Sequence, residues 1–275
     1  PKIIVGKAGS GMHIHMRIMK DGKSCMTESG KLSDIAHRAI AGMMTLAPAI
    51  TAFGNKNPTS YFRLVPHQEA PTNICWGDCN RSALVRVPLG WSTANDMCAD
   101  ANPVENHCKY SDGYEVSDAS AKQTVEMRSP DGSADIYQLI AGLCVACRHG
   151  FEMKDALEVA DKTYVNYNIH DAENADRVAA LKQLPDSCAA SAECLEEYRK
   201  VFEEHGVFSP AMIDGIINQL KTFNDSTLRQ DIENNNEEIQ KQVLADEKSQ
   251  KYLEGFNVLK VIVVPKKIVN VVLKK

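Results

Sequence analysis

The sequence contains no apolar run long enough to cross a bilayer, and residues 1–8 lack the apolar stretch of a secretion signal. It also lacks an excess of positive charge, since 31 Lys and Arg residues face 36 Asp and Glu residues, for a formal net charge of -5. Proteins that bind nucleic acid usually present a basic face. We therefore expect a cytoplasmic, globular protein with neither nucleic acid nor membrane as a partner.

The cysteines lack the pattern of a disulfide framework, because there are nine of them at irregular spacings. Cys144 and Cys147 form a C-x-x-C pair, a spacing that occurs in redox motifs and in half of a zinc site. The pair lies in the apolar run 136–147, with no second Cys or His pair at metal spacing nearby. This context favours a core helix with reduced thiols.

Polar and apolar residues alternate over Gly11–Met19, with Met12, Ile14, Met16 and Ile18 on one face and His13, His15 and Arg17 on the other. That period predicts a strand with one core face and one polar face. Short strands are also predicted near 72–76, 82–87 and 124–128. The polar stretch 89–123 between the last two has no helical or strand period, which is typical of a surface excursion or a subunit contact.

Helical spacing predicts a helix over residues 34–46, with Ser33 as its cap and Pro48 just past its end. The most apolar predicted helix covers 135–151, and a long charged helix covers 226–253. Lysines and β-branched residues dominate 255–275, which favours an added strand over a buried helix. We expect three parts: a catalytic-domain segment at 1–225, a helix at 226–254, and a basic apolar tail at 255–275 that is a docked or non-native extension.

Four segments place histidines, arginines and carboxylates on polar faces of predicted strands or loops. Each residue alone is a weak signal, because most exposed ion pairs contribute little. In combination, histidine and carboxylate ligands suit a divalent cation, and planar guanidiniums suit phosphate and carboxylate groups. Together these groups indicate phosphoryl transfer. The residues are His13, His15, Arg63, Glu69, Arg81, Arg86, Glu126 and Arg128.

These segments read GSGMHIH at 9–15, NPTSYFRLVPHQEAP at 57–71, NRSALVRVP at 80–88 and EMRSPD at 126–131. In this order they resemble the motifs of bacterial-type glutamine synthetases. The resemblance covers roughly residues 7–150 and extends more weakly to about residue 220. It implies ATP-dependent formation of glutamine from glutamate and ammonium through γ-glutamyl phosphate, with Mg²⁺ or Mn²⁺. It also implies an α+β fold, in which an antiparallel sheet forms part of an open barrel flanked by helices, and a double-ring homo-oligomer.

Carried over residue by residue, the resemblance gives each motif position a role. His13 and Glu126 resemble metal ligands, and His15 and Arg86 resemble groups that contact the nucleotide phosphates. Glu69 resembles the flap carboxylate that takes a proton from ammonium. The residues that resemble the glutamate and phosphoryl contacts are Gly11, Arg63, Arg81 and Arg128.

The chain departs from the family at several points. The family's upstream glutamates and its N-terminal β-grasp domain have no counterpart here, so we expect the chain by itself to be inactive. Arg17 stands where the family often has serine, His67 where it has glycine, and 89–123 is longer than the family's link. Two alternatives remain: a ligase of the same fold that joins an amine or polyamine to glutamate, and a non-catalytic assembly module.

Overall fold

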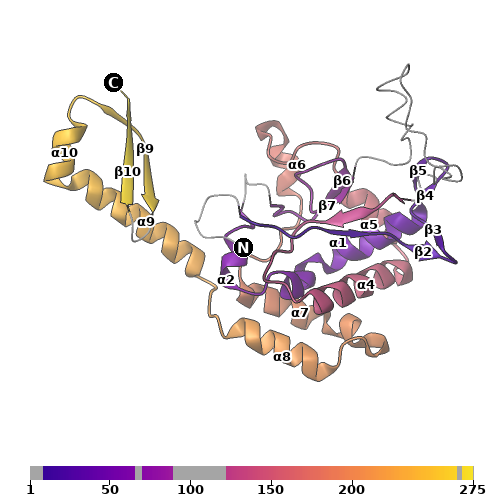
Figure 1. Ribbon diagram of the computed structural model, residues 1–275. Helices are drawn as coiled ribbons and strands as arrows, with labels where there is room; N and C mark the ends of the chain where they lie inside the picture. Colours follow the sequence, from indigo (N-terminus) through magenta and orange to yellow (C-terminus); the bar gives the residue numbers. More distant parts are fainter. Residues whose placement is uncertain (1–8, 66–69, 89–121, 265–267, 275) are drawn as a thin grey trace, which may run out of the picture. The chain divides into compact units, whose positions relative to one another are not determined.

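The computed structural model describes residues 9–65, 70–88, 122–264 and 268–274 (Figure 1). Its contacts divide the chain into two compact units, Pro1–Phe223 and Asn224–Lys275. No described helix is both long and apolar enough to cross a membrane.

The first unit is built on a sheet with the strand order β1 (Ile14–Met16), β8 (Val125–Met127), β7 (Val85–Val87) and β6 (Trp76–Asp78). The pairings β1–β8 and β8–β7 are antiparallel, whereas β7–β6 is parallel. The predicted apolar face of the first strand packs on the core through Met12, Ile14, Met16 and Ile18. The predicted α+β class with antiparallel strand pairs is therefore confirmed.

Two short hairpins follow β1, formed by β2 (Met19–Lys20) with β3 (Lys23–Ser24) and by β4 (Thr27–Glu28) with β5 (Lys31–Leu32). Each turn has a residue pair ending in glycine, and both residues of each pair have positive φ: Asp21-Gly22 at 51° and 76°, and Ser29-Gly30 at 50° and 77°. This is the backbone of the tight hairpin turns that match strand twist.

Helix α1 spans Asp34–Gly54 and contains Pro48, so the prediction that this helix ends before the proline is wrong. A proline inside a helix costs about 3 kcal/mol, because it removes a backbone donor and clashes with the preceding turn. The residues beyond Pro48 offset that cost, since Ile50, Ala52 and Phe53 are fully buried. Burying side chains of this size contributes about 1.5–3 kcal/mol for each large one.

Helices α1 and α4 (Ile136–Glu152) lie on one side of the sheet (Figure 1). The side chain of Asp135 caps α4, and those of Ser187 and Ser209 cap α7 (Cys188–Glu203) and α8 (Pro210–Lys221). The shorter helices are α2 (Pro58–Tyr61), α5 (Ala156–Thr163) and α6 (Ala175–Ala179), with single 3₁₀ turns at Ala172–Asn174 and Glu204–Gly206.

The C-x-x-C pair lies on α4, where Cys147 is buried and Cys144 is exposed. Burial raises the pKa of Cys147 to about 12. All of the cysteines that the structure describes are free thiols. The prediction of reduced cysteines on a core helix is confirmed for the helix, although only Cys147 faces the core.

The second unit contains α9 (Leu228–Ala245), α10 (Glu247–Leu253) and a hairpin of β9 (Asn257–Val264) with β10 (Ile268–Lys274). The predicted single helix over 226–253 is divided at Asp246, whose extended backbone and side chain cap α10. The β-branched tail forms strands, as its composition predicts.

Candidate active site

Glu126 is the centre of the polar face of the sheet. Its side chain is 1% exposed, and the strand register places His15 opposite it on β1 and Arg86 opposite it on β7. Residues paired across neighbouring strands point to the same face. The sheet therefore brings His15, Arg86 and Glu126 together, although His15 and Glu126 are 111 positions apart in the chain.

The Glu126 carboxylate is compensated by three basic groups. His13 Nδ1 lies 2.7 Å from Oε1, and His15 Nε2 lies 3.7 Å from the same oxygen. Arg86 Nε lies 2.6 Å from Oε2. A buried carboxylate without such partners would be strongly destabilising, so these contacts allow the charge to persist in the interior. Three residues predicted from the motifs therefore lie together, because His13 and Arg86 both contact the carboxylate of Glu126.

Burial lowers the pKa of His13, and the nearby Arg128 and Arg63 guanidiniums act in the same direction, while Glu126 opposes them. A lowered pKa favours the neutral imidazole, which is the form that coordinates a metal ion.

Arg63 is buried and its guanidinium spans a turn of the backbone. Nη1 donates to the Ser129 carbonyl at 2.7 Å, and Nη2 donates to the Arg128 carbonyl at 3.1 Å. Gly11 lies directly against this guanidinium, because a Cβ added at Gly11 would be 2.3 Å from Nη2. Any larger residue at position 11 would displace Arg63, which gives a physical reason for glycine in the first motif.

Arg128 is also buried, and its Nη1 donates to the carbonyls of Arg81 and Ala83. Arg128 therefore joins the segment after β8 to the segment before β7, and Arg63 joins the segment after α2 to the one after β8. Both side chains donate to backbone carbonyls in this structure. Their role as glutamate contacts was predicted from the sequence, and the geometry by itself does not assign it.

A pocket of about 680 Å³ opens beside the Glu126 cluster, and its charged lining residues are all basic: Arg81, Arg86 and Lys122, with His15 at its edge. His15 Nδ1 lies 3.1 Å from Thr124 Oγ1, which orients the ring. Guanidinium and ammonium groups around an open pocket favour an anion with several oxygens, such as a polyphosphate. Lys122 was missed by the sequence analysis, because it falls at the end of a stretch without a regular period.

Glu69, the predicted flap carboxylate, lies outside the described residues, as does nearly all of the predicted 89–123 excursion.

A divalent cation fits the cluster in part. One imidazole nitrogen of His13 and one carboxylate oxygen of Glu126 converge, and this donor pair suits Mg²⁺ or Mn²⁺. Both ions commonly keep water or substrate oxygens as further ligands. His15 lies near Glu126 as well, but among the residues that the structure describes no third His, Cys, Asp or Glu has a ligand atom within 4.8 Å of those of both His13 and Glu126. The cluster and its basic pocket define an α+β domain with a candidate cation and phosphate site.

Residues 1–107 and 115–239 match the family model of the glutamine synthetase catalytic domain. The glutamine synthetase of Mycolicibacterium smegmatis is 36% identical over 218 residues, which are 78% of this chain and 39% of the relative. That of Thermococcus kodakarensis is 34% identical over 201 residues, which are 73% of this chain and 38% of the relative. The chain belongs to the glutamine synthetase family, and it spans about two fifths of the length of these relatives.

Solved structures support the same fold. A cryo-EM structure of Plasmodium falciparum glutamine synthetase superposes with a TM-score of 0.59 at 18% identity, covering 83% of this chain and 46% of that one. A crystal structure described as a novel glutamine synthase homolog gives a TM-score of 0.52 at 19% identity, covering 79% of this chain and 42% of that one. At these identities the likeness concerns the fold alone.

Proposed function

We propose that this chain supplies part of the active site for ATP-dependent ligation of ammonia to glutamate. The observation that carries the proposal is the buried Glu126 carboxylate, which His13 and Arg86 contact beside a pocket whose charged groups are basic. Family membership supports the same reaction class. The proposed substrates are glutamate, ammonium and ATP, and the proposed assembly is a cytoplasmic homo-oligomer of the double-ring type.

The reaction has two steps. The γ-carboxylate oxygen of glutamate attacks the γ-phosphorus of ATP, and the bond to the β-phosphate oxygen breaks to release ADP. Ammonia then attacks the γ-carbonyl carbon, and the carbon–oxygen bond breaks to release phosphate. In both steps the protein positions the reactants and compensates charge, which is where most of the catalytic contribution arises in phosphoryl transfer.

Individual side chains take roles within this scheme. His15, Arg81 and Arg86 bind phosphate oxygens, and Lys122 joins them from the pocket wall. Gly11, Arg63 and Arg128 shape the glutamate subsite, with Arg128 near the γ-carboxylate. Glu69 takes the proton that ammonium must lose before it attacks.

His13 and Glu126 would hold Mg²⁺ or Mn²⁺. When bound, such an ion supplies charge neutralisation for phosphate oxygens. The remaining ligands would come from phosphate, water or residues outside the described ranges. Residues 1–225 are proposed as the catalytic-domain segment, with 226–254 and 255–275 as appended parts.

Binding of Mn²⁺ to the 275-residue chain tests the proposal, measured by electron paramagnetic resonance of the free ion. We expect His13→Ala and Glu126→Gln each to weaken binding by about tenfold or more. His149→Ala is the matched control, because it removes a histidine from α4 without touching the cluster. Circular dichroism verifies folding of each variant. Equal Mn²⁺ affinity in wild type and both site variants would refute the metal assignment.

An amine acceptor other than ammonia is the second candidate, as is a non-catalytic assembly role. Product analysis with ATP, glutamate and either ammonium or a polyamine separates the two enzymes when it is made on a protein that also contains the upstream glutamates. Absence of those glutamates from the parent gene would favour the assembly role.

A further inference from the structure

The turn that follows β8, residues 128–131, is contacted by side chains from two other parts of the chain. Arg63 donates to two of its backbone carbonyls. Asn55 follows the last residue of α1, and its Nδ2 donates to the Ser129 carbonyl at 2.9 Å and to Asp131 Oδ2 at 3.1 Å. The Ser129 carbonyl therefore accepts hydrogen bonds from two separate segments at once.

Asn55 and Asp131 are both fully buried. Asp131 Oδ1 accepts from the Ser133 N–H at 2.8 Å, and the Asp131 N–H donates to the Gly54 carbonyl at 3.1 Å. Hydrogen bonds at buried positions are costly to lose, because the group left behind has no access to bulk water. Together the two residues form the Asn55–Asp131 clamp, which fixes the turn to the end of α1.

The clamped turn is connected to both proposed metal ligands. Glu126 lies on β8, directly before the turn. On the other side, the N–H of Met12 donates to the Pro130 carbonyl at 2.8 Å, and Met12 is followed in the chain by His13. A displacement of the turn would therefore move the backbone beside each ligand. The distance of 2.7 Å between His13 Nδ1 and Glu126 Oε1 depends on where the turn lies.

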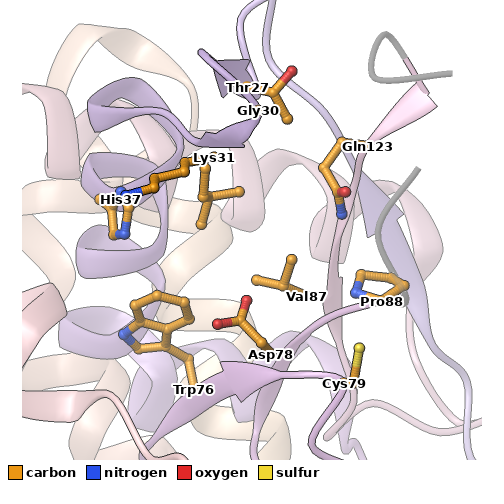
Figure 2. A pocket seen from close by; sticks show the side chains of 11 residues that line it. Thr27, Gly30, Lys31, His37, Trp76, Asp78, Cys79, Val87, Pro88 and Gln123 are labelled. Atoms are coloured by element: carbon orange, nitrogen blue, oxygen red, sulfur yellow. The ribbon is translucent and has the colours of Figure 1, made fainter. Parts of the chain in front are cut away.

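His37 lies at the other end of α1, in its first turn, where it lines the pocket shown in Figure 2 together with Trp76 and Asp78. Its Nδ1 lies 2.9 Å from the Ser33 carbonyl oxygen. A carbonyl oxygen can only accept, so this contact selects the imidazole form with the proton on Nδ1. The ring is roughly 25 Å from Asn55 along the helix, which makes it a reference for changes confined to the clamp.

We propose that Asn55 and Asp131 are positioning residues for the pair of His13 and Glu126. They act through the 128–131 turn, whose position sets how closely the imidazole and the carboxylate approach each other. Metal sites need ligands held within about 0.5 Å of the productive geometry by surrounding hydrogen bonds. The role of the clamp in ion binding rests on the proposed function, whereas its effect on the approach of the two side chains concerns the metal-free chain.

The tautomer of His13 tests the clamp without a metal ion. An ionised carboxylate only accepts, so the neutral His13 ring beside Glu126 should have its proton on Nδ1. Long-range proton–nitrogen correlation spectra of the 275-residue chain at pH 8 report the tautomer of each ring, and His37 is the internal reference. In Asn55→Ala we expect the His13 signals to shift towards the Nε2–H form while those of His37 stay unchanged. Unchanged His13 signals in the folded variant overturn the proposal.

Thr51→Val is the matched control. Thr51 is fully buried on α1, one turn before Asn55, and its hydroxyl lies 2.6 Å from Ser191 Oγ. The variant removes a buried polar contact from the same helix without removing a contact to the turn. It should lower the melting temperature and leave the His13 signals unchanged. A Thr51→Val variant that shifts them as far as Asn55→Ala would reduce the effect to general destabilisation and overturn the proposal.

Asn55→Ser is the second variant, and it decides the test if Asn55→Ala does not fold. Serine keeps a polar group at the position but offers one donor in place of the two that reach Ser129 and Asp131. We expect a smaller shift of the His13 signals in the same direction. Wild-type signals from both folded Asn55 variants, or from Asn55→Ser alone where it is the one that folds, refute the positioning role.

Mn²⁺ titration separates this proposal from the proposed function. In Asn55→Ala the affinity, measured by electron paramagnetic resonance of the free ion, should fall by about threefold to tenfold, which is less than the loss from removing a ligand. A wild-type chain that does not bind Mn²⁺ refutes the metal assignment, and the His13 tautomer then decides the clamp. Wild-type binding of Mn²⁺ with the same affinity in folded Asn55→Ala overturns the positioning role.

Discussion

Gly42 of α1 and Gly150 of α4 lie against each other's helix backbone. A Cβ added at Gly42 would be 1.9 Å from the Ala146 carbonyl oxygen, and one added at Gly150 would be 1.9 Å from the Arg38 carbonyl oxygen. Neither oxygen can move without moving its helix, so the two glycines set the distance between α1 and α4. This contact supports the helical layer on which the sheet and the candidate active site rest.

Gly42→Ala and Gly150→Ala should each destabilise the protein by about 1–3 kcal/mol or more, because the added methyl group forces the helices apart. Gly215→Ala on α8 is the control, since nothing lies within 4 Å of a Cβ added there. In an open helical position the same change should stabilise by about 0.5–1 kcal/mol. Urea unfolding measures all three, and a stabilised Gly42→Ala variant would contradict the close approach.

The sequence predicted the two helices of this contact but not their meeting. The spacing of apolar residues predicts which face of a helix is buried. It correctly placed Gly42 and Gly150 in helices. Which faces pack together depends on residues more than 100 positions apart, as in the Gly42 and Gly150 pair. The same limit explains the error at Pro48, because the burial of Ile50 and Phe53 against other helices outweighs a local signal.

The candidate site was more predictable, because its residues lie in motifs with fixed spacing. The resemblance implied the same role as metal ligands for His13 and Glu126, and His13 Nδ1 lies 2.7 Å from Glu126 Oε1. Lys122 was missed because its neighbours carry no motif and its position in the basic pocket depends on the fold.

Lys122→Ala should weaken binding of inorganic triphosphate to the chain by about threefold to tenfold, because one of the basic groups around the pocket is lost. The loss should shrink at high salt, since exposed charges are screened. Lys182→Ala is the control, because Lys182 lines a different pocket. Calorimetric titration at two salt concentrations measures the effect. An affinity that is independent of Lys122 at both concentrations would exclude this lysine from the anion site.

Arg63→Lys should destabilise the protein by about 1–3 kcal/mol, because an ammonium group cannot donate at once to the separate carbonyls that the planar guanidinium reaches. Arg199→Lys is the comparison, since Arg199 pairs with Glu196, Glu203 and Asp214 on the surface. Surface ion pairs contribute about 0–1 kcal/mol. Thermal unfolding should therefore shift for Arg63→Lys and hardly for Arg199→Lys, and equal shifts would show that Arg63 does not organise the turn at 128–130.

Cysteine reactivity should follow burial. Burial raises the pKa of Cys75 to about 11 and that of Cys147 to about 12, so at pH 8 both remain thiols and lie out of reach of reagents. Cys144 and Cys79 are exposed. Iodoacetamide at pH 8 should modify Cys144 and Cys79 in the folded protein, and Cys75 and Cys147 only after unfolding. Mass spectrometry after timed quenching reads each site, and rapid labelling of Cys147 in the folded protein would contradict the packing of α4.

The last prediction concerns the hairpin at the end of the second unit. Its strands β9 and β10 pair with each other over nearly their whole length, and the contacts of residues 224–275 form a unit of their own. Leu259 is 61% exposed, so the hairpin has an apolar side chain that it does not bury. A chain truncated after Glu254 should therefore keep the main thermal transition of residues 1–223 within about 2 °C, which is below the shift expected for a loss of 1 kcal/mol in a domain of this size. The truncated chain should also aggregate less, because an exposed two-stranded hairpin has free edges that pair with other chains. Differential scanning calorimetry and light scattering measure the two effects at matched concentration. A fall of the main transition by more than about 5 °C would show that residues 255–275 stabilise the catalytic-domain segment directly.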